Sequence, residues 1–272
     1  MKKILCPTDF SDTAQNAIVY AAKLAQATGS HLILFNVQSI FDLVPQETGH
    51  GNTLTGHSVS DTLEEQSQEI SSTFKISCYA EVQPSSTTLA KTIAHKAVGY
   101  DLIVMGTNGP DDIFQFLTGS NAYKACVESS VPVLLIPENC MYSEIKTLVY
   151  AFDYLRERKL PLTQLIPWIK CLKCELSILQ VMEEAYSEEA EEDSRELQHI
   201  SQKLYAEDIK LKFDTIHSYE IAESIHSYVL RTQPDVLALC TIHRNLIERL
   251  FHNSLIRNIS SVSNYPVFVF HN

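Results

Sequence analysis

The sequence predicts two tandem domains of the doubly wound α/β class, each with its own parallel sheet. Three observations carry this prediction: the chain repeats itself, each copy alternates strand-like with helix-like segments, and the strands are short continuous apolar runs. The chain has 272 residues, which is enough for two domains of ordinary size. The length and the repeat together predict one domain over 1–140 and a second over 144–272.

The repeat has a period close to half the chain, and such a period must be recognised before any fold is assigned. The first strand-like run, KKILCPTD at 2–9, aligns with KTLVYAFD at 146–153, and each ends in an Asp. A later run, DLIVMGTNG at 101–109, aligns with DVLALCTIH at 235–243. The same register lays VPVLLIPEN over YPVFVFHN, so that a proline enters the last strand of both copies. These matches indicate two copies of one domain.

Each element of the first copy is expected from its residue pattern. The strands are expected at Ile4–Pro7, His31–Val37, Ile76–Val82, Leu102–Met105 and Pro132–Ile136. Helices are expected from Ala14 to Gly29, over Asp61–Ser72, over Ser86–Val98 and from Ser120. Strands that alternate with helices predict crossover connections and a mostly parallel sheet. Continuous apolar strands are typical of a sheet that is covered on both faces.

Composition disfavours two classes of partner. Against 33 Asp and Glu the chain has 21 Lys and Arg, a formal net charge of -12, which disfavours non-specific attraction to nucleic acid or an anionic membrane. The longest apolar runs, of five or six residues, are far too short to span a bilayer. Seven irregularly spaced cysteines favour reduced thiols in a cytosol. We therefore expect a soluble cytoplasmic protein, and a homodimer or another protein partner stays open.

Glycines mark a candidate ligand site in the first copy. Ligands of open parallel sheets bind beyond the carboxyl ends of the strands, where the strand order reverses. Gly106 and Gly109 follow the apolar strand 102–105, and Gly119 and Ser120 open the next helix. Glycine lets backbone amides approach an anion closely, and a helix N-terminus favours phosphate. The simpler alternative is a tight turn at Gly106 and Gly109, with Gly119 merely preceding a helix.

Catalytic signatures are missing from the sequence. Neither G-x-x-x-x-G-K-[ST] nor a G-x-G-x-x-G turn after the first strand occurs, which disfavours a Walker-type hydrolase and a dinucleotide site. A nucleophile pattern such as G-x-S-x-G is also absent, so nothing demands an enzyme.

Asp9, at the end of the first strand, offers a carboxylate for hydrogen bonds from a ribose or adenine, or for a metal ion.

The spacing G-2x-G-9x-G-[ST] after the fourth strand, with P-T-D after the first, resembles the universal stress protein family. The tandem copies resemble its double-domain members. The resemblance implies a five-stranded, adenine nucleotide alpha hydrolase-like domain that pairs with the second through its last strand, here 132–136 against 266–270. It also implies a role in stress response; some members bind ATP and others do not, and we expect ATP or AMP here, with or without Mg²⁺. Any hydrolysis is expected to be very slow, because no general base or activating Lys is apparent in the sequence. The implied adenosine contacts are Pro7, Thr8, Asp9 and Val37, and the implied phosphate and ribose contacts are Met105, Gly106, Gly109, Gly119, Ser120 and Asn121.

Two departures from the family pattern bear on the ligand. Asp111 and Asp112 stand where family loops often carry a basic residue, and carboxylates repel a triphosphate unless a cation bridges them. The second copy contains no glycine, which predicts a degenerate domain without nucleotide, although Asp153 matches Asp9. Its residues at the motif positions are Cys240, His243, Asn253 and Ser254. The alternative function is a tandem stress protein that binds no nucleotide and acts as an interaction scaffold.

Three further features of the sequence are explained without a functional role. Cys171 and Cys174 have the spacing of a redox or metal pair but lack the second pair of a zinc site, so ordinary thiols are favoured. His50 and His57 are expected in a surface loop. The acidic stretch 183–196 is expected to begin a solvated helix, with a docking surface for a basic partner as the alternative.

Overall fold

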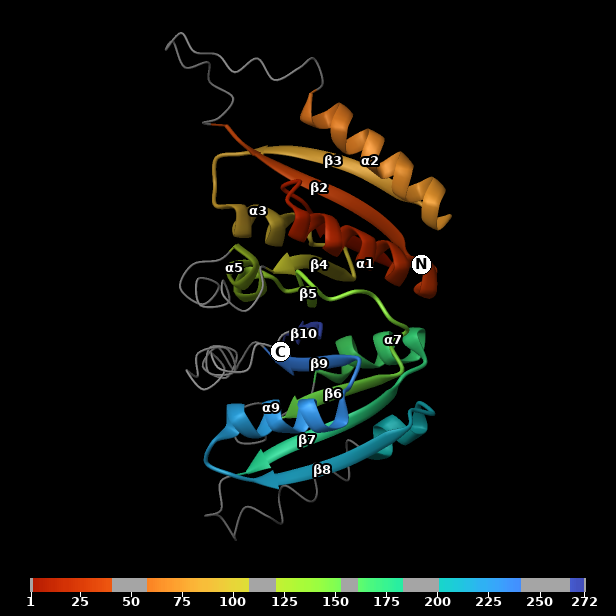
Figure 1. The fold of residues 1–272 in the computed structure, drawn as a ribbon, viewed down its shortest axis with the longest axis vertical. Coiled ribbons are helices and arrows are strands. Elements are labelled where there is room, and N and C mark those ends of the chain that lie inside the picture. The colour runs from red at the N-terminus through yellow and green to blue at the C-terminus, as the bar shows by residue number, and fades with distance from the viewer. Residues whose placement is uncertain are drawn as a thin grey trace. The chain divides into compact units, whose positions relative to one another are not determined.

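A computed structural model describes residues 2–40, 58–107, 121–152, 161–182, 201–240 and 265–271. These residues form two compact units, and the chain passes from the first to the second between Tyr142 and Ser143. Each unit contains a sheet of five parallel strands with helices packed against it (Figure 1). The predicted α/β class with parallel sheets is thereby confirmed.

The sheet of the first unit has the strand order β3-β2-β1-β4-β5. Its strands are β1 (Lys3–Pro7), β2 (His31–Ser39), β3 (Cys78–Ser85), β4 (Leu102–Thr107) and β5 (Val133–Pro137). All neighbouring strands in this order are parallel. β4 extends two residues beyond the predicted strand, so Gly106 lies within the strand and not after it.

The helices of the first unit cover both faces of this sheet. They are α1 (Asp12–Thr28), α2 (Val59–Phe74), α3 (Leu89–Lys96) and α5 (Asn121–Glu128). α1 packs on α2, and α3 packs on α5. From β1, the strands β2 and β3 follow on one side of the sheet, and β4 and β5 follow on the other side. Right-handed crossovers therefore place the two pairs of helices on opposite faces, which is the doubly wound arrangement.

The boundaries of α1 follow from its sequence. The Ser11 hydroxyl accepts a hydrogen bond from the Ala14 amide at 3.2 Å and so caps the first turn. Gly29 ends the helix in the left-handed conformation, with φ of 63°, as the sequence predicted. The residues at helical spacing, Ile18 and Leu24 among them, are buried against the sheet.

The second unit repeats the architecture of the first, with the strand order β8-β7-β6-β9-β10. Its strands are β6 (Thr147–Phe152), β7 (Glu175–Met182), β8 (Leu211–His217), β9 (Val236–Cys240) and β10 (Val267–Phe270). Its helices include α7 (Leu162–Leu172) and α9 (Ile221–Thr232). All neighbouring strands are again parallel, so the prediction of a second copy is confirmed. The expected pairing of the last strands of the two copies stays a prediction.

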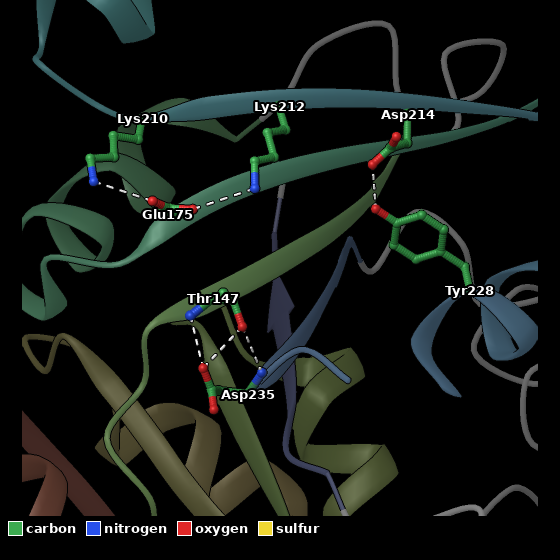
Figure 2. A network of polar contacts seen from close by, with 7 residues as sticks. All are labelled: Thr147, Glu175, Lys210, Lys212, Asp214, Tyr228 and Asp235. Carbon is green, nitrogen blue, oxygen red and sulfur yellow. Dashed lines mark hydrogen bonds and ion pairs between the residues drawn. The ribbon is translucent and has the colours of Figure 1, made fainter. Parts of the chain in front are cut away.

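The repeat extends to individual hydrogen bonds. Asp101, just before β4, accepts a hydrogen bond from the Lys3 amide at 2.7 Å, which ties it to the start of β1. Asp235, just before β9, accepts from the amide and the hydroxyl of Thr147 at 2.8 and 3.0 Å, at the start of β6 (Figure 2). In both copies, therefore, an aspartate joins the two equivalent strands, β1 and β4 in the first copy and β6 and β9 in the second.

Candidate functional site

The candidate site of the first unit lies where the strand order reverses. β1 pairs with β2 on one side and with β4 on the other, and ligands of open parallel sheets bind at the carboxyl ends of such strands. Leu5 pairs with Ile103, and the same register brings Pro7 level with Met105. Val37 lies on the neighbouring strand β2. The structure thus places the predicted residues of three strands at one edge of the sheet.

Thr8 is anchored firmly at the end of β1. Its amide donates to the Phe35 carbonyl at 2.9 Å, and its carbonyl accepts from the side-chain amide of Asn36 at 2.8 Å. Its hydroxyl oxygen accepts from the Phe10 amide at 3.1 Å. Asn36 is buried, and a polar residue within the apolar run HLILFNV is the sequence signal by which it could have been found. Asn36 therefore fixes the turn that carries Asp9.

Asp9 is exposed and uses one of its two carboxylate oxygens within the turn. Oδ1 accepts from the Ser11 amide at 3.1 Å and from the Ser11 hydroxyl at 2.6 Å. Ser11 in turn caps α1, so the carboxylate supports the cap. Within the part of the chain that the structure describes, the hydrogen bonds of Asp9 all run to Oδ1. The other oxygen, Oδ2, is therefore available to a ligand.

Phe10 has a backbone conformation that is unusual for an aromatic residue. Its φ is 66°, and its side chain is 40% exposed. The left-handed region costs a residue with a Cβ about 1–2 kcal/mol. Hydrogen bonds at Thr8 and Ser11 hold the turn on both sides of Phe10, and strained residues of this kind cluster at functional sites. No pattern in the sequence signals a positive φ at this position.

Gly106 is required by packing between β4 and α1. A Cβ at this position would lie 2.5 Å from the carbonyl oxygen of Thr13 and 2.8 Å from its Cγ2. The residue lies in a strand, so the tight turn considered as the simpler alternative is wrong for Gly106. Met105 is buried within β4, and its contact with a ligand stays a prediction.

The remaining predicted contacts are only partly described. Asn121 begins α5 and is exposed. Gly109, Gly119 and Ser120 lie outside the described residues, and their roles stay predictions.

The family model described as the universal stress protein family matches residues 1–137. The chain belongs to the universal stress protein family. No curated protein sequence matches this chain.

Solved structures show that the fold extends over both units of this universal stress protein. A universal stress protein from Archaeoglobus fulgidus is 18% identical with a TM-score of 0.69, over 99% of this chain and 98% of that one. A functionally unknown protein from Pseudomonas aeruginosa is 14% identical with a TM-score of 0.61, over 100% of this chain and 92% of that one. The cytoplasmic domain of a prokaryotic cation chloride cotransporter is 10% identical with a TM-score of 0.53, over 98% of this chain and 94% of that one. At these identities the likeness shows the fold alone.

The second unit of this universal stress protein differs at the position that matches Gly106. Cys240 ends β9, and its side chain is fully buried. A thiol thus occupies the place where the first unit allows only a hydrogen atom. Asp153, His243, Asn253 and Ser254 lie outside the described residues.

The described residues give little support to the other functional features considered from the sequence, which are the cysteine pair, a metal site and the acidic stretch. Cys174 follows α7, and burial raises the pKa of its thiol to about 11, so it is protonated and unreactive at neutral pH. Among the residues that the structure describes, no group of three or more His, Cys, Asp or Glu is placed to hold a metal ion. No described helix is both long and apolar enough to cross a membrane. His50, His57 and the stretch 183–196 lie outside the described ranges.

Proposed function

We propose that this universal stress protein binds an adenine nucleotide, ATP or AMP, in its N-terminal unit and acts in stress signalling through occupancy of that site. The observation that carries the proposal is that Asp9, at the reversal of strand order, accepts its hydrogen bonds from the described residues at Oδ1, which leaves Oδ2 for a ligand. Hydrolysis is at most very slow, because the sequence carries neither a Walker lysine nor a recognisable general base.

The charges around α1 favour one orientation of the nucleotide. Asp9 and Asp12 flank the start of this helix, and Ser11 already caps it, so a phosphate is disfavoured there. The adenine amino group and the ribose hydroxyls are donors that match the acceptor Oδ2 of Asp9. Val37 is half-buried and offers an apolar contact to the base. The phosphates then extend toward the start of α5, whose N-terminus at Asn121 favours an anion.

Isothermal titration with ATP and AMP, with and without Mg²⁺, tests the proposal. The decisive variant is Asp9→Asn, because its amide oxygen can still accept the two bonds from Ser11 while an NH₂ donor replaces Oδ2. We expect binding at least about tenfold weaker, equivalent to about 1.4 kcal/mol, with an unchanged Tm. Asp12→Asn is the matched control, since it removes a nearby carboxylate that makes no side-chain hydrogen bond or ion pair with the described residues, and its affinity should not fall.

Two outcomes would contradict the proposal. Affinity weaker than about 1 mM for both nucleotides, or about -4 kcal/mol, would favour the scaffold function. Unchanged affinity in Asp9→Asn would remove Asp9 from the site.

A further inference from the structure

A depression in the second unit lies between the carboxyl end of β8 and one face of α9. Its volume is about 560 Å³, within the range of about 300–1,000 Å³ that is usual for small-molecule sites. The residues that line it are Thr215, Ile216, Ser218, Glu220, Glu223, Ser224, Ser227, Tyr228 and Arg231. This depression is separate from the candidate nucleotide site, which belongs to the first unit.

At the corresponding corner of the first unit, hydroxyl groups form hydrogen bonds with one another. Ser85, at the end of β3, and Thr92, on α3, lie 2.6 Å apart through their side-chain oxygens. Thr87 lies 3.1 Å from Thr92 and 3.2 Å from Ser85, which completes the ring. These hydroxyls therefore satisfy one another.

The second unit has hydroxyls at this corner that face open space. Ser224 follows the N-cap of α9 by four residues, just as Thr92 follows the N-cap of α3. Ser224 and Ser227 line the depression, and no hydrogen bond joins their hydroxyls to another residue in the described part of the chain. Among the described residues, the Ser218 hydroxyl oxygen accepts a hydrogen bond from the Glu220 amide alone, at 3.0 Å. Donors and acceptors that are paired in the first unit are thus offered to a ligand here.

The floor of the depression is fixed by Tyr228. This residue is 4% exposed, and its hydroxyl donates to the Asp214 carboxylate on β8 (Figure 2). The Arg231 guanidinium lies over the Tyr228 ring, 5.4 Å from its centroid. Arg231 is therefore positioned at the depression while its N–H donors remain free of a carboxylate among the described residues.

The charges of the lining residues select the class of ligand. Glu220 and Glu223 disfavour a phosphate or carboxylate, and Arg231 disfavours a cation. A neutral molecule with many hydroxyl groups meets none of these penalties, because each hydroxyl both donates and accepts hydrogen bonds.

We propose that the depression between β8 and α9 binds a small neutral polyhydroxyl molecule, a sugar or a polyol. The two carboxylates accept from its hydroxyls, the guanidinium of Arg231 donates to them, and the serine hydroxyls do both. Binding at this site does not require nucleotide in the first unit.

Saturation-transfer NMR and calorimetry on the full chain test this proposal, with glucose, trehalose and glycerol as probes. We expect at least one probe to bind with a Kd in the millimolar range. Ser227→Leu places a bulky apolar side chain in the depression at an exposed helical position, and should weaken that binding at least tenfold. Ser72→Leu, at an exposed position of α2 in the first unit, is the matched control and should bind as the native chain does.

Ser224→Ala provides a second variant that removes a hydroxyl without adding bulk, and it should also weaken binding. An absence of binding by all three probes would overturn the proposal. Equal binding by Ser227→Leu and the native chain would do so too. Glycine and inorganic phosphate serve as charged probes, and tighter binding of either, lost in Ser227→Leu, would overturn the neutral class of ligand.

Discussion

At the scale of single residues, Gly106 shows how a motif glycine can act through packing. The Cβ of an alanine would lie 2.5 Å from the main-chain oxygen of Thr13. We expect Gly106→Ala to lower the free energy of unfolding by about 1–3 kcal/mol, as overpacking does. Urea denaturation followed by circular dichroism measures this.

The clash at Gly106 arises from the main chain of Thr13, and this allows a control experiment. Because the nearest atom belongs to the backbone, adding Thr13→Ala should recover little of the lost stability. Full recovery in the double variant would show that the side chain of Thr13, and not its carbonyl, makes Gly106 necessary.

Phe10 carries the second prediction at this scale. Phe10→Gly and Phe10→Ala both remove an exposed ring, but only glycine adopts a φ of 66° without steric cost. We expect the glycine variant to be the more stable of the two by about 1 kcal/mol. Thermal denaturation compares them directly, and equal Tm values would mean that the turn relaxes away from its left-handed conformation.

The sequence predicted which residues form this site, but it explained only in part why those residues are needed there. Asp9 stands out in the sequence because it ends an apolar strand. That Oδ1 is committed to Ser11 depends on the shape of the turn, which the sequence does not reveal. Gly106 was expected for its freedom of conformation, whereas the structure requires it because α1 lies so close. Such a contact joins residues far apart in the chain.

At the scale of elements, both units connect a carboxylate on the edge strand to the helix that follows it. Glu81 on β3 bonds with Lys96 of α3 and accepts from the Tyr100 hydroxyl at 3.3 Å. Asp214 on β8 accepts from Tyr228 of α9 (Figure 2). The second unit thus makes with a tyrosine the link that the first makes with a lysine.

This link predicts a loss of stability at alkaline pH. Burial, followed by the bond to Asp214, raises the pKa of the Tyr228 phenol from about 10 to about 12. Folding therefore favours the neutral phenol, and this contribution is complete below pH 10 and disappears as pH rises through 12. We expect the free energy of unfolding to fall less steeply over this range in Tyr228→Phe than in the native chain. Urea denaturation at several pH values measures the slope, and identical slopes would contradict the role of Tyr228.

Element boundaries show where the sequence pattern becomes ambiguous. The central strands, such as β4 and β5, were predictable because each is a continuous apolar run in a sheet covered on both faces. The edge strand β3 is polar and half-exposed, and it spans Cys78–Ser85 where the sequence predicted Ile76–Val82. α3 begins at Leu89 and not at Ser86, because the Thr88 hydroxyl caps it by accepting from the Lys91 amide. Ser85, Ser86, Thr87 and Thr88 are all residues that can cap a helix, so the sequence did not reveal which one does.

At the scale of the whole molecule, the two copies share the same strands, but the sequences of their loops differ. The family model matches only the first copy, while the fold of the Archaeoglobus protein covers 99% of the chain. Strands buried on both faces tolerate few changes, whereas loops beyond their ends vary freely. The tandem fold was therefore predictable from the apolar runs, and the function of the second copy was not.

This asymmetry predicts one nucleotide per chain, bound by the first unit. A ligand that binds only the folded state stabilises the segments it contacts by mass action. In hydrogen exchange, saturating ATP or AMP should slow the amides of Thr8, Asn36 and Gly106, while those of Cys240 and Gln180 exchange as before. Gly106 and Asn36 match Cys240 and Gln180 in the repeat, so each pair compares like positions. Protection of both members, with two nucleotides per chain by calorimetry, would mean that a buried thiol in place of Gly106 still permits binding.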